Sequence, residues 1–319
     1  MHAAVLRGLG AAPRCEQFAD PVPPGDELIV EVRASSLKPV DKQLASGSHF
    51  ASSNDLPVIC GTDGVGTLSD GTRGFFGGPR PPYGAMAERT VVRREFCFPL
   101  PENIDDKVAA AFPNPGVSAW LSLTFRGKLL HGESVLILGA TGVTGRLAVR
   151  IAKLLGAARL VAAGRNRQVL NTLPEFGADT NIRLDVSDDE LREAFASAVR
   201  GAGFQVVLDY LWGRPVEILL SAMTRKEFST SISTNRLVQV GESAGPTISL
   251  PAAVLRSTDF SILGTAGIPP RDILIEALHK VLSHAASGEL SIDTEHVRLR
   301  DIEEAWGRDP QGRRLVVIP

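Results

Sequence analysis

The chain has few cysteines and no long hydrophobic run. Its three cysteines, Cys15, Cys60 and Cys97, are odd in number and far apart in a sequence of 319 residues. A disulfide framework needs an even, closely spaced set, so this pattern predicts free thiols in a reducing compartment. No apolar stretch reaches the ~18 residues that a membrane-spanning helix needs. The opening residues predict a first strand and lack a secretory pattern, so we expect a cytoplasmic protein.

Charge of either sign is not in excess. The chain has 34 Lys and Arg residues against 36 Asp and Glu residues, a formal net charge of −2. Binding to nucleic acid or to an anionic membrane depends on a strong positive field, which this balance does not provide. We therefore expect neither partner. A length of 319 residues with 44% apolar residues predicts two globular domains.

A glycine-rich segment after an apolar run is the most informative feature present. Residues 135–138, Val-Leu-Ile-Leu, predict a buried parallel strand, and helical periodicity follows. Glycines between such a strand and helix let the backbone turn sharply and approach a pyrophosphate, which the helix N-terminus attracts. We therefore expect a bound dinucleotide; a turn without a ligand is the alternative. The residues expected to contact it are Gly139, Thr141, Gly142, Val143, Thr144 and Gly145.

The residues after the next predicted strand, 159–163, indicate which dinucleotide is bound. Folds that bind NAD usually place Asp or Glu here to accept hydrogen bonds from the ribose. This chain instead has Gly164-Arg165-Asn166-Arg167. A small glycine leaves room for a 2′-phosphate, and guanidinium groups bind phosphate bidentately. The segment therefore favours NADPH over NADH. Solvated loop arginines are the alternative, which is stronger for Arg167 than for Arg165.

The order of the predicted elements divides the chain into two parts. Up to about residue 130, short strands alternate with Gly and Pro turns, and strands are expected at 28–34, 64–68, 87–92 and 97–100. Further strands, now alternating with helices, are expected at 135–138, 159–163, 205–209, 236–240 and 259–264. This rhythm predicts an α/β protein with a doubly wound parallel Rossmann sheet and a separate β-rich domain. A helix near 271–287 and a strand over 315–318 close the chain.

Several segments resemble one protein family in a shared order. They include Pro21-Val-Pro-Pro-Gly25, Ser36-Leu-Lys-Pro-Val-Asp41, the hinge residues 109–120, Val206-Val-Leu-Asp209 and Gly312-Arg-Arg-Leu-Val316. The chain resembles the medium-chain dehydrogenase/reductase superfamily, and within it the zinc-free quinone oxidoreductases of the zeta-crystallin type. The resemblance implies a GroES-like catalytic domain over 1–115, an NADP-binding Rossmann domain over 116–264 and a segment, 265–319, that returns to the first domain. It also implies a homodimer formed by the edge strand 259–264.

The resemblance implies an activity as well. An NADPH-dependent enzyme of this type transfers hydride, or electrons, to a small-molecule substrate, a quinone or an α,β-unsaturated carbonyl. No metal is expected, because three cysteines cannot form a four-thiolate structural zinc site, and Cys60-Gly-Thr-Asp63 aligns with a turn of the family that lacks zinc ligands here. An enoyl-thioester reductase of the same superfamily and a non-catalytic NADPH-binding redox sensor remain as alternatives.

Charge that develops on the acceptor oxygen needs a hydrogen-bond donor or a cation beside it. Lys38 and Tyr83 are the candidates, and Lys38 stands where the family has Asn. The alternative for Lys38 is a solvated surface side chain. Asp41 has two expected roles: it orients Lys38 or the nicotinamide ribose, or it caps the helix that begins at Pro39.

The nicotinamide side of the cofactor has its own expected neighbours. The resemblance implies that Ser118, Gly241 and Thr265 border it. The chain departs from the family at Leu184, where many members carry a Tyr near the adenosine phosphate.

Overall fold

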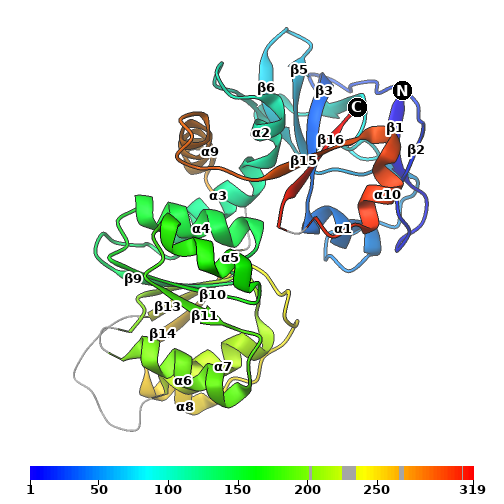
Figure 1. Ribbon diagram of the computed structural model, residues 1–319. Coiled ribbons are helices and arrows are strands. Elements are labelled where there is room, and N and C mark those ends of the chain that lie inside the picture. Colours follow the sequence, from blue (N-terminus) through cyan, green and yellow to red (C-terminus); the bar gives the residue numbers. More distant parts are fainter. Residues whose placement is uncertain (201–202, 225–234, 266–268, 311) are drawn as a thin grey trace. The chain divides into compact units, whose positions relative to one another are not determined.

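A computed structural model describes the chain except for residues 201–202, 225–234, 266–268 and 311. The described residues form two compact units (Figure 1). The first unit combines Met1–Asn114 with Leu278–Pro319, and the second unit is Pro115–Ala277. Helix α9 (Arg271–Ala286) contains the second boundary, so the end of the chain belongs to the same unit as its beginning.

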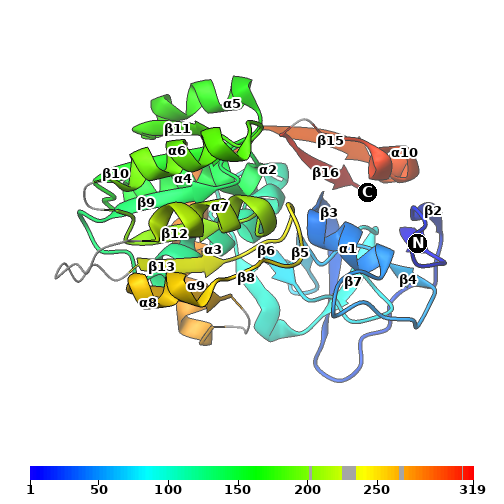
Figure 2. The same cartoon turned by 90° about the horizontal axis from the view of Figure 1, so that it is seen from below.

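A parallel sheet of six strands forms the centre of the second unit. Its order is β11-β10-β9-β12-β13-β14 (Figure 2). The strands are β9 (Ser134–Leu138), β10 (Arg159–Gly164), β11 (Thr180–Arg183), β12 (Val206–Asp209), β13 (Asn235–Gln239) and β14 (Phe260–Gly264). The expected doubly wound sheet is therefore confirmed. The strand order reverses between β9 and β12, and ligands of such sheets bind beyond the carboxyl ends of the strands at this point.

Helices cover both faces of this sheet. Figure 1 shows α4 (Val143–Leu154) and α5 (Arg167–Thr172) on one side, and α6 (Asp188–Val199), α7 (Gly213–Met223) and α8 (Ala252–Ser257) on the other. The central strand β9 is buried along its whole length, as a strand covered on both faces must be. Leucine, valine and phenylalanine side chains from α6 and α7 pack on the sheet and form one core.

The first unit is rich in antiparallel strands. A three-stranded sheet joins β2 (Arg14–Gln17), β1 (His2–Leu6) and β4 (Val58–Ile59). The larger sheet has the order β15-β16-β3-β5-β6-β8, and β7 also pairs with β3. Its strands are β3 (Leu28–Leu37), β5 (Asp63–Leu68), β6 (Arg73–Gly77), β7 (Arg89–Val92), β8 (Cys97–Pro99), β15 (Thr294–Arg298) and β16 (Arg314–Ile318). The last strand, β16, pairs antiparallel with β3 and so ties the C-terminal segment into this unit.

Three helices accompany these strands: α1 (Pro39–Ser46), α2 (Asp106–Ala111) and α10 (Ile302–Gly307). Helix α3 (Pro113–Leu121) follows α2 and contains the boundary into the second unit. Among the described residues, no helix is both long and apolar enough to cross a membrane. The three cysteines are free thiols.

Candidate functional site

The turn after β9 has the backbone geometry of a phosphate-binding turn. Gly139 adopts a φ of 89°, a backbone conformation that residues other than glycine rarely adopt. A Cβ atom at Gly145 would lie 2.2 Å from the Gly139 carbonyl oxygen, so only glycine lets the first turn of α4 approach the strand end. Gly142 is the exposed N-cap of α4, and within the described part of the chain no side chain caps it. Thr141, Val143 and Thr144 lie half-buried in the same turn.

Gly164, at the end of β10, packs against this turn. A Cβ atom at Gly164 would lie 2.4 Å from the Thr141 Cγ2 atom and 2.8 Å from its hydroxyl oxygen. Close packing on Thr141 therefore requires glycine here. Arg165, Asn166 and Arg167 follow and are exposed. Asn166 is the N-cap of α5, and its side-chain oxygen accepts a hydrogen bond from the Val169 N–H at 3.1 Å.

A third arginine, which the sequence analysis missed, lies beside Gly164. Arg183 ends strand β11 and is paired in register with Gly164. Its guanidinium donates to both carboxylate oxygens of Asp185, at 3.1 Å and 2.7 Å. Hydrogen bonding from Arg183, with a smaller contribution from the charge of Arg165, lowers the pKa of Asp185. Both arginines therefore lie close enough to act on one carboxylate. Leu184 is buried in the core of the second unit.

The loop after β12 lies against the glycine turn. The Tyr210 N–H donates to the Leu138 carbonyl oxygen at 3.1 Å. A Cβ atom at Gly139 would lie 3.1 Å from the Leu211 Cδ2 atom and 3.2 Å from the Tyr210 Cβ atom. The loop also contains a strained residue, because Trp212 adopts a φ of 56°.

The buried Asp209 carboxylate holds this loop. Its Oδ1 atom accepts hydrogen bonds from the N–H groups of Leu211, at 2.9 Å, and Trp212, at 3.1 Å. Burial raises the pKa of Asp209 to about 6, although these two N–H groups act in the opposite direction. The carboxylate thus fixes the backbone directly beside the glycine turn.

The loop after β13 meets the same edge. A Cβ atom at Gly241 would lie 2.8 Å from the Tyr210 carbonyl oxygen, so the close approach that Gly241 permits is to the loop after β12. The Ser243 hydroxyl donates to that oxygen at 3.1 Å. Thr265, just beyond β14, donates its hydroxyl to the Gln239 carbonyl oxygen at 3.3 Å. Ser118 is half-buried on α3.

The first unit contains a buried cluster of charges around Lys38. The Lys38 ammonium lies 2.8 Å from Asp63 Oδ1, 2.9 Å from the Ser36 carbonyl oxygen and 3.2 Å from Asp41 Oδ2. Burial lowers the pKa of Lys38, but the two carboxylates outweigh it, so the pKa stays above its usual value and the side chain is charged. Lys38 is only 1% exposed, so the solvated alternative is wrong. The ammonium donates hydrogen bonds to Asp63 and to the Ser36 carbonyl oxygen and forms an ion pair with Asp41.

Asp41 makes two of the expected contacts. It pairs with Lys38, and its Oδ2 atom accepts the Lys38 backbone N–H at 2.9 Å, which caps helix α1. Its Oδ1 atom accepts from the N–H and hydroxyl of Thr62, both at 3.1 Å. Tyr83 has separate contacts: its hydroxyl donates to the Asp20 carbonyl oxygen at 3.3 Å, and its ring meets Phe18 edge to face.

Cys60 and the other possible metal ligands form no metal centre in the described residues, where no three His, Cys, Asp or Glu side chains gather as ligands would. Burial raises the pKa of the Cys60 thiol to about 12, so it is not a thiolate at neutral pH. Cys60 instead packs in the core of the first unit.

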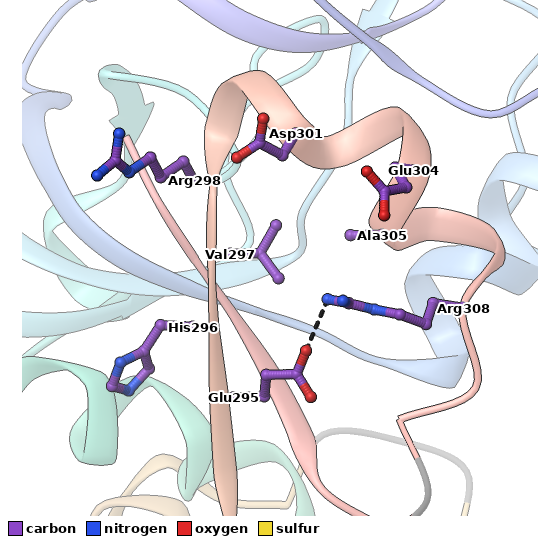
Figure 3. Close-up of a pocket in the computed structure, with 8 residues that line it drawn as sticks. All are labelled: Glu295, His296, Val297, Arg298, Asp301, Glu304, Ala305 and Arg308. Atoms are coloured by element: carbon purple, nitrogen blue, oxygen red, sulfur yellow. Dashed lines mark ion pairs between the residues drawn. The ribbon is translucent and has the colours of Figure 1, made fainter.

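A cavity of about 300 Å³ lies between β15 and α10, and none of the residues described above lines it (Figure 3). Its walls are Glu295, His296, Val297, Arg298, Asp301, Glu304, Ala305 and Arg308. Glu295 is paired with Arg308 and with Arg313, each at 2.8 Å. The residues expected to bind a cofactor lie elsewhere, so this cavity is not the candidate site.

A doubly wound sheet with a glycine-rich turn at its reversal point, joined to a β-rich unit that contains both chain ends, is the fold of the medium-chain dehydrogenase/reductase superfamily. Within that superfamily the chain resembles the quinone oxidoreductases. The quinone oxidoreductase of Thermus thermophilus, solved also with NADPH, matches with a TM-score of 0.81 and 26% identity over 100% of both chains.

Curated relatives are similar in sequence. A component chain of the phenolphthiocerol/phthiocerol polyketide synthase of Mycobacterium tuberculosis is 30% identical over 293 residues, which are 85% of this chain and 12% of the synthase chain. The 2-methylene-furan-3-one reductase of Solanum lycopersicum is 27% identical over 232 residues, 66% of this chain and 59% of the reductase. The chain thus spans less than two thirds of the length of these relatives. No protein-family model matches the sequence.

Proposed function

We propose that the chain is a zinc-independent oxidoreductase that transfers hydride, or electrons, from NADPH to a quinone or an α,β-unsaturated carbonyl. The observation that carries this proposal is the glycine turn at the reversal point of the sheet, with Gly164 and Arg165 where NAD-binding folds have an acid. The Thermus thermophilus relative, named as a quinone oxidoreductase and solved with NADPH, supports it.

The residues of the second unit fit a bound dinucleotide. The N–H groups of the turn 139–145 hold the pyrophosphate, because they lie at the N-terminus of α4, which attracts anions. Gly145 lets this first turn of α4 pack closely on the strand end. Arg165 binds the 2′-phosphate, and Asn166 and Arg167 flank it. Ser118, Gly241 and Thr265 border the nicotinamide half. NADPH supplies the hydride, and the protein's task is to position it and to exclude water.

The first unit provides the substrate side, in our proposal. Tyr83 is the candidate donor to the acceptor oxygen, where negative charge develops, and its single hydroxyl hydrogen leaves the Asp20 carbonyl oxygen to take this role. Lys38 and Asp41 remain predicted residues of the same site. Because the Lys38 ammonium bonds to Asp63 and Ser36 and is paired with Asp41, all in its own unit, we assign to Lys38 and Asp41 the task of fixing the junction between β3 and α1.

Assembly and location are further parts of the proposal. Strand β14 is the edge of the parallel sheet, and Ile262 on it is 36% exposed. An edge strand with an exposed apolar side chain favours pairing with a second copy, so we infer a homodimer. We place it in the cytoplasm because its cysteines are free thiols, as in a reducing compartment. Sedimentation of the purified chain at micromolar concentration tests the homodimer, and a monomer would contradict it.

The activity is tested by the loss of reduced-nicotinamide absorbance with ortho- and para-quinones and simple enones, in the presence of EDTA. We expect turnover that EDTA does not reduce. Loss of turnover with EDTA would contradict zinc independence.

An enoyl-thioester reductase is the second candidate, because the polyketide synthase relative is similar over 85% of this chain. A crotonyl thioester in the same assay separates the two: faster turnover of the thioester than of any quinone or enone would favour the second candidate. NADPH binding without turnover of any acceptor would favour a redox sensor.

A further inference from the structure

Arg183 and Asp185 form an exposed ion pair beside the residues proposed to bind the 2′-phosphate. The Arg183 guanidinium donates to both Asp185 carboxylate oxygens, at 3.1 Å and 2.7 Å. The two side chains are 46% and 42% exposed, so an anion from solution has access to them. Two parallel hydrogen bonds from a guanidinium are also the geometry in which arginine binds phosphate. Asp185 therefore occupies donors that suit a phosphate group.

The register of the parallel sheet places Arg183 on the side of the glycine turn. Arg183 is paired in register with Gly164, and side chains in register on neighbouring strands leave the same face of a sheet. A Cβ atom at Gly164 would lie 2.4 Å from the Thr141 Cγ2 atom, within the glycine turn. The Arg183 side chain therefore leaves the sheet on the face where that turn lies, one strand further along.

Arg165 acts on the same carboxylate. Hydrogen bonding from Arg183 is the largest cause of the lowered pKa of Asp185, and the positive charge of Arg165 adds to it. Within the described part of the chain, no residue forms a hydrogen bond or an ion pair with Arg165. Two guanidinium groups thus face one carboxylate. A phosphate monoester, with about two negative charges and three acceptor oxygens, matches two guanidinium groups better.

The backbone on both sides of Asp185 is held in place. The Leu184 N–H donates to the Gly164 carbonyl oxygen at 3.0 Å. The Arg214 guanidinium donates to the carbonyl oxygens of Leu184, at 3.2 Å, and Val186, at 2.8 Å. Release of the Asp185 carboxylate from Arg183 therefore needs only a rotation of exposed side chains, with the loop unchanged.

We propose that the 2′-phosphate of NADPH displaces the Asp185 carboxylate from Arg183, so that Arg183 joins Arg165 as a ligand of this phosphate and Asp185 is an internal competitor for it. This inference rests on the proposed function, since it requires a dinucleotide at the glycine turn. Competition lowers the affinity for NADPH and leaves NADH, which lacks that phosphate, unaffected. The ion pair thus sets how strongly the chain discriminates between the two cofactors.

The substitutions Asp185→Asn and Arg183→Ala test this, because each removes one member of the ion pair. The purified full-length proteins are titrated with NADPH and with NADH at one salt concentration, followed by fluorescence. We expect Asp185→Asn to lower the NADPH dissociation constant roughly three- to tenfold and Arg183→Ala to raise it roughly tenfold. The NADH constant should stay the same in both variants, which also shows that they are folded.

The double variant Arg183→Ala/Asp185→Asn separates competition for Arg183 from simple repulsion of the phosphate. If Asp185 acts by occupying Arg183, its removal should gain about twofold or less once Arg183 is absent. An equal gain in both backgrounds would show repulsion alone and would overturn the proposal.

The matched control is Asp189→Asn, which removes another exposed carboxylate of the same unit, paired there with Arg192. It should change neither dissociation constant by more than about twofold, because exposed charges at a distance are screened by salt. A gain in NADPH affinity equal to that of Asp185→Asn would show a general effect of charge and would overturn the proposal.

The remaining outcomes separate this inference from the proposed function. Weaker NADH binding by Asp185→Asn would show that Asp185 binds the adenosine ribose, as acids do in folds that bind NAD, and would overturn the inference. Unchanged NADPH binding by this variant would overturn it too, with the proposed function intact. Binding by the wild-type chain without turnover of any acceptor would overturn the proposed activity, while the titrations would still decide the role of Asp185. A wild-type chain that binds neither dinucleotide would overturn both.

Discussion

Arg165 and Arg183 show how much of the candidate site depends on single residues. The place of Arg165 after a predicted strand identifies it in the sequence. Arg183 has no such signal, because its strand, Thr-Asn-Ile-Arg, has one buried residue, Ile182, and lacks the apolar run that marks its neighbours. The register of β10 with β11 brings both arginines to one end of the sheet. The sequence therefore predicts Arg165, whereas Arg183 joins the site only because β10 and β11 pair in the folded chain.

The variant Arg165→Ala should weaken NADPH binding without affecting NADH. A guanidinium bonded to a phosphate contributes roughly ten- to hundredfold in affinity, and NADH lacks that phosphate. Titration of the variant with both dinucleotides measures the effect, with Arg167→Ala as the control that should change neither constant as much. Equal weakening of NADPH and NADH by Arg165→Ala would contradict the 2′-phosphate assignment.

Asp209 makes stability depend on pH. Its pKa of about 6 in the folded chain exceeds the value of about 3.9 for an unfolded Asp, so the folded state holds the proton more tightly. Protonated Asp209 therefore contributes to the free energy of unfolding in full below about pH 4, and this contribution is lost as the pH rises through about 6. Asp209→Asn keeps the oxygen that accepts both N–H groups and cannot ionise.

The stability of Asp209→Asn relative to the wild type should therefore increase by about 3 kcal/mol between about pH 4 and pH 7. Urea denaturation at several pH values, followed by a signal of the second unit, measures it. A constant difference across this range would show that Asp209 does not titrate as described.

At the scale of elements, the apolar runs predict most of the parallel strands, and helical periodicity predicts α4 and α9. Burial on both faces makes such strands evident in a sequence. The charge cluster cannot be predicted in the same way. Lys38, between β3 and α1, pairs with Asp63 at the start of β5, 25 positions away, and only the folded chain brings them together. Lys38 is buried although lysine is mostly exposed in proteins, so its residue type gave no sign of this position.

The glycine turn is predicted to tolerate alanine at one position and not at another. Gly145→Ala would place a Cβ atom 2.2 Å from a backbone oxygen, so we expect a loss of at least about 1–3 kcal/mol and of dinucleotide binding. Gly142→Ala is the control for stability, because its Cβ atom would meet only the Gly139 oxygen, at 3.5 Å. Thermal unfolding measures both variants, and NADPH titration compares Gly145→Ala with the wild type. Equal losses of stability would contradict this packing.

Removal of Lys38 should destabilise the first unit. Lys38→Met leaves two buried carboxylates without their shared cation, which costs about 3–5 kcal/mol in comparable sites. Denaturation of Lys38→Met and of the double variant Lys38→Met/Asp63→Asn measures it, and we expect the second substitution to restore part of the loss. A stable Lys38→Met variant that loses turnover alone would instead support a direct catalytic role for Lys38.

At the scale of the whole molecule, sequence predicts two structural parts and the α/β class. The pattern changes near residue 130 from turn-rich short strands to alternating strands and helices. One hydrophobic cluster of the first unit consists of residues before this point, and the core of the second unit consists of residues after it. The return of the C-terminal segment is implied by family resemblance alone. In the structure it is made by β16, which pairs with β3 across most of the chain length, a contact with no local signal.

The most direct test of the account is the ratio of the NADPH and NADH dissociation constants of the wild-type chain, measured under one buffer and salt condition. We predict that NADPH binds at least roughly tenfold more tightly, because Arg165 is the proposed ligand of the 2′-phosphate, which NADH lacks. Equal affinities, or tighter binding of NADH, would contradict it.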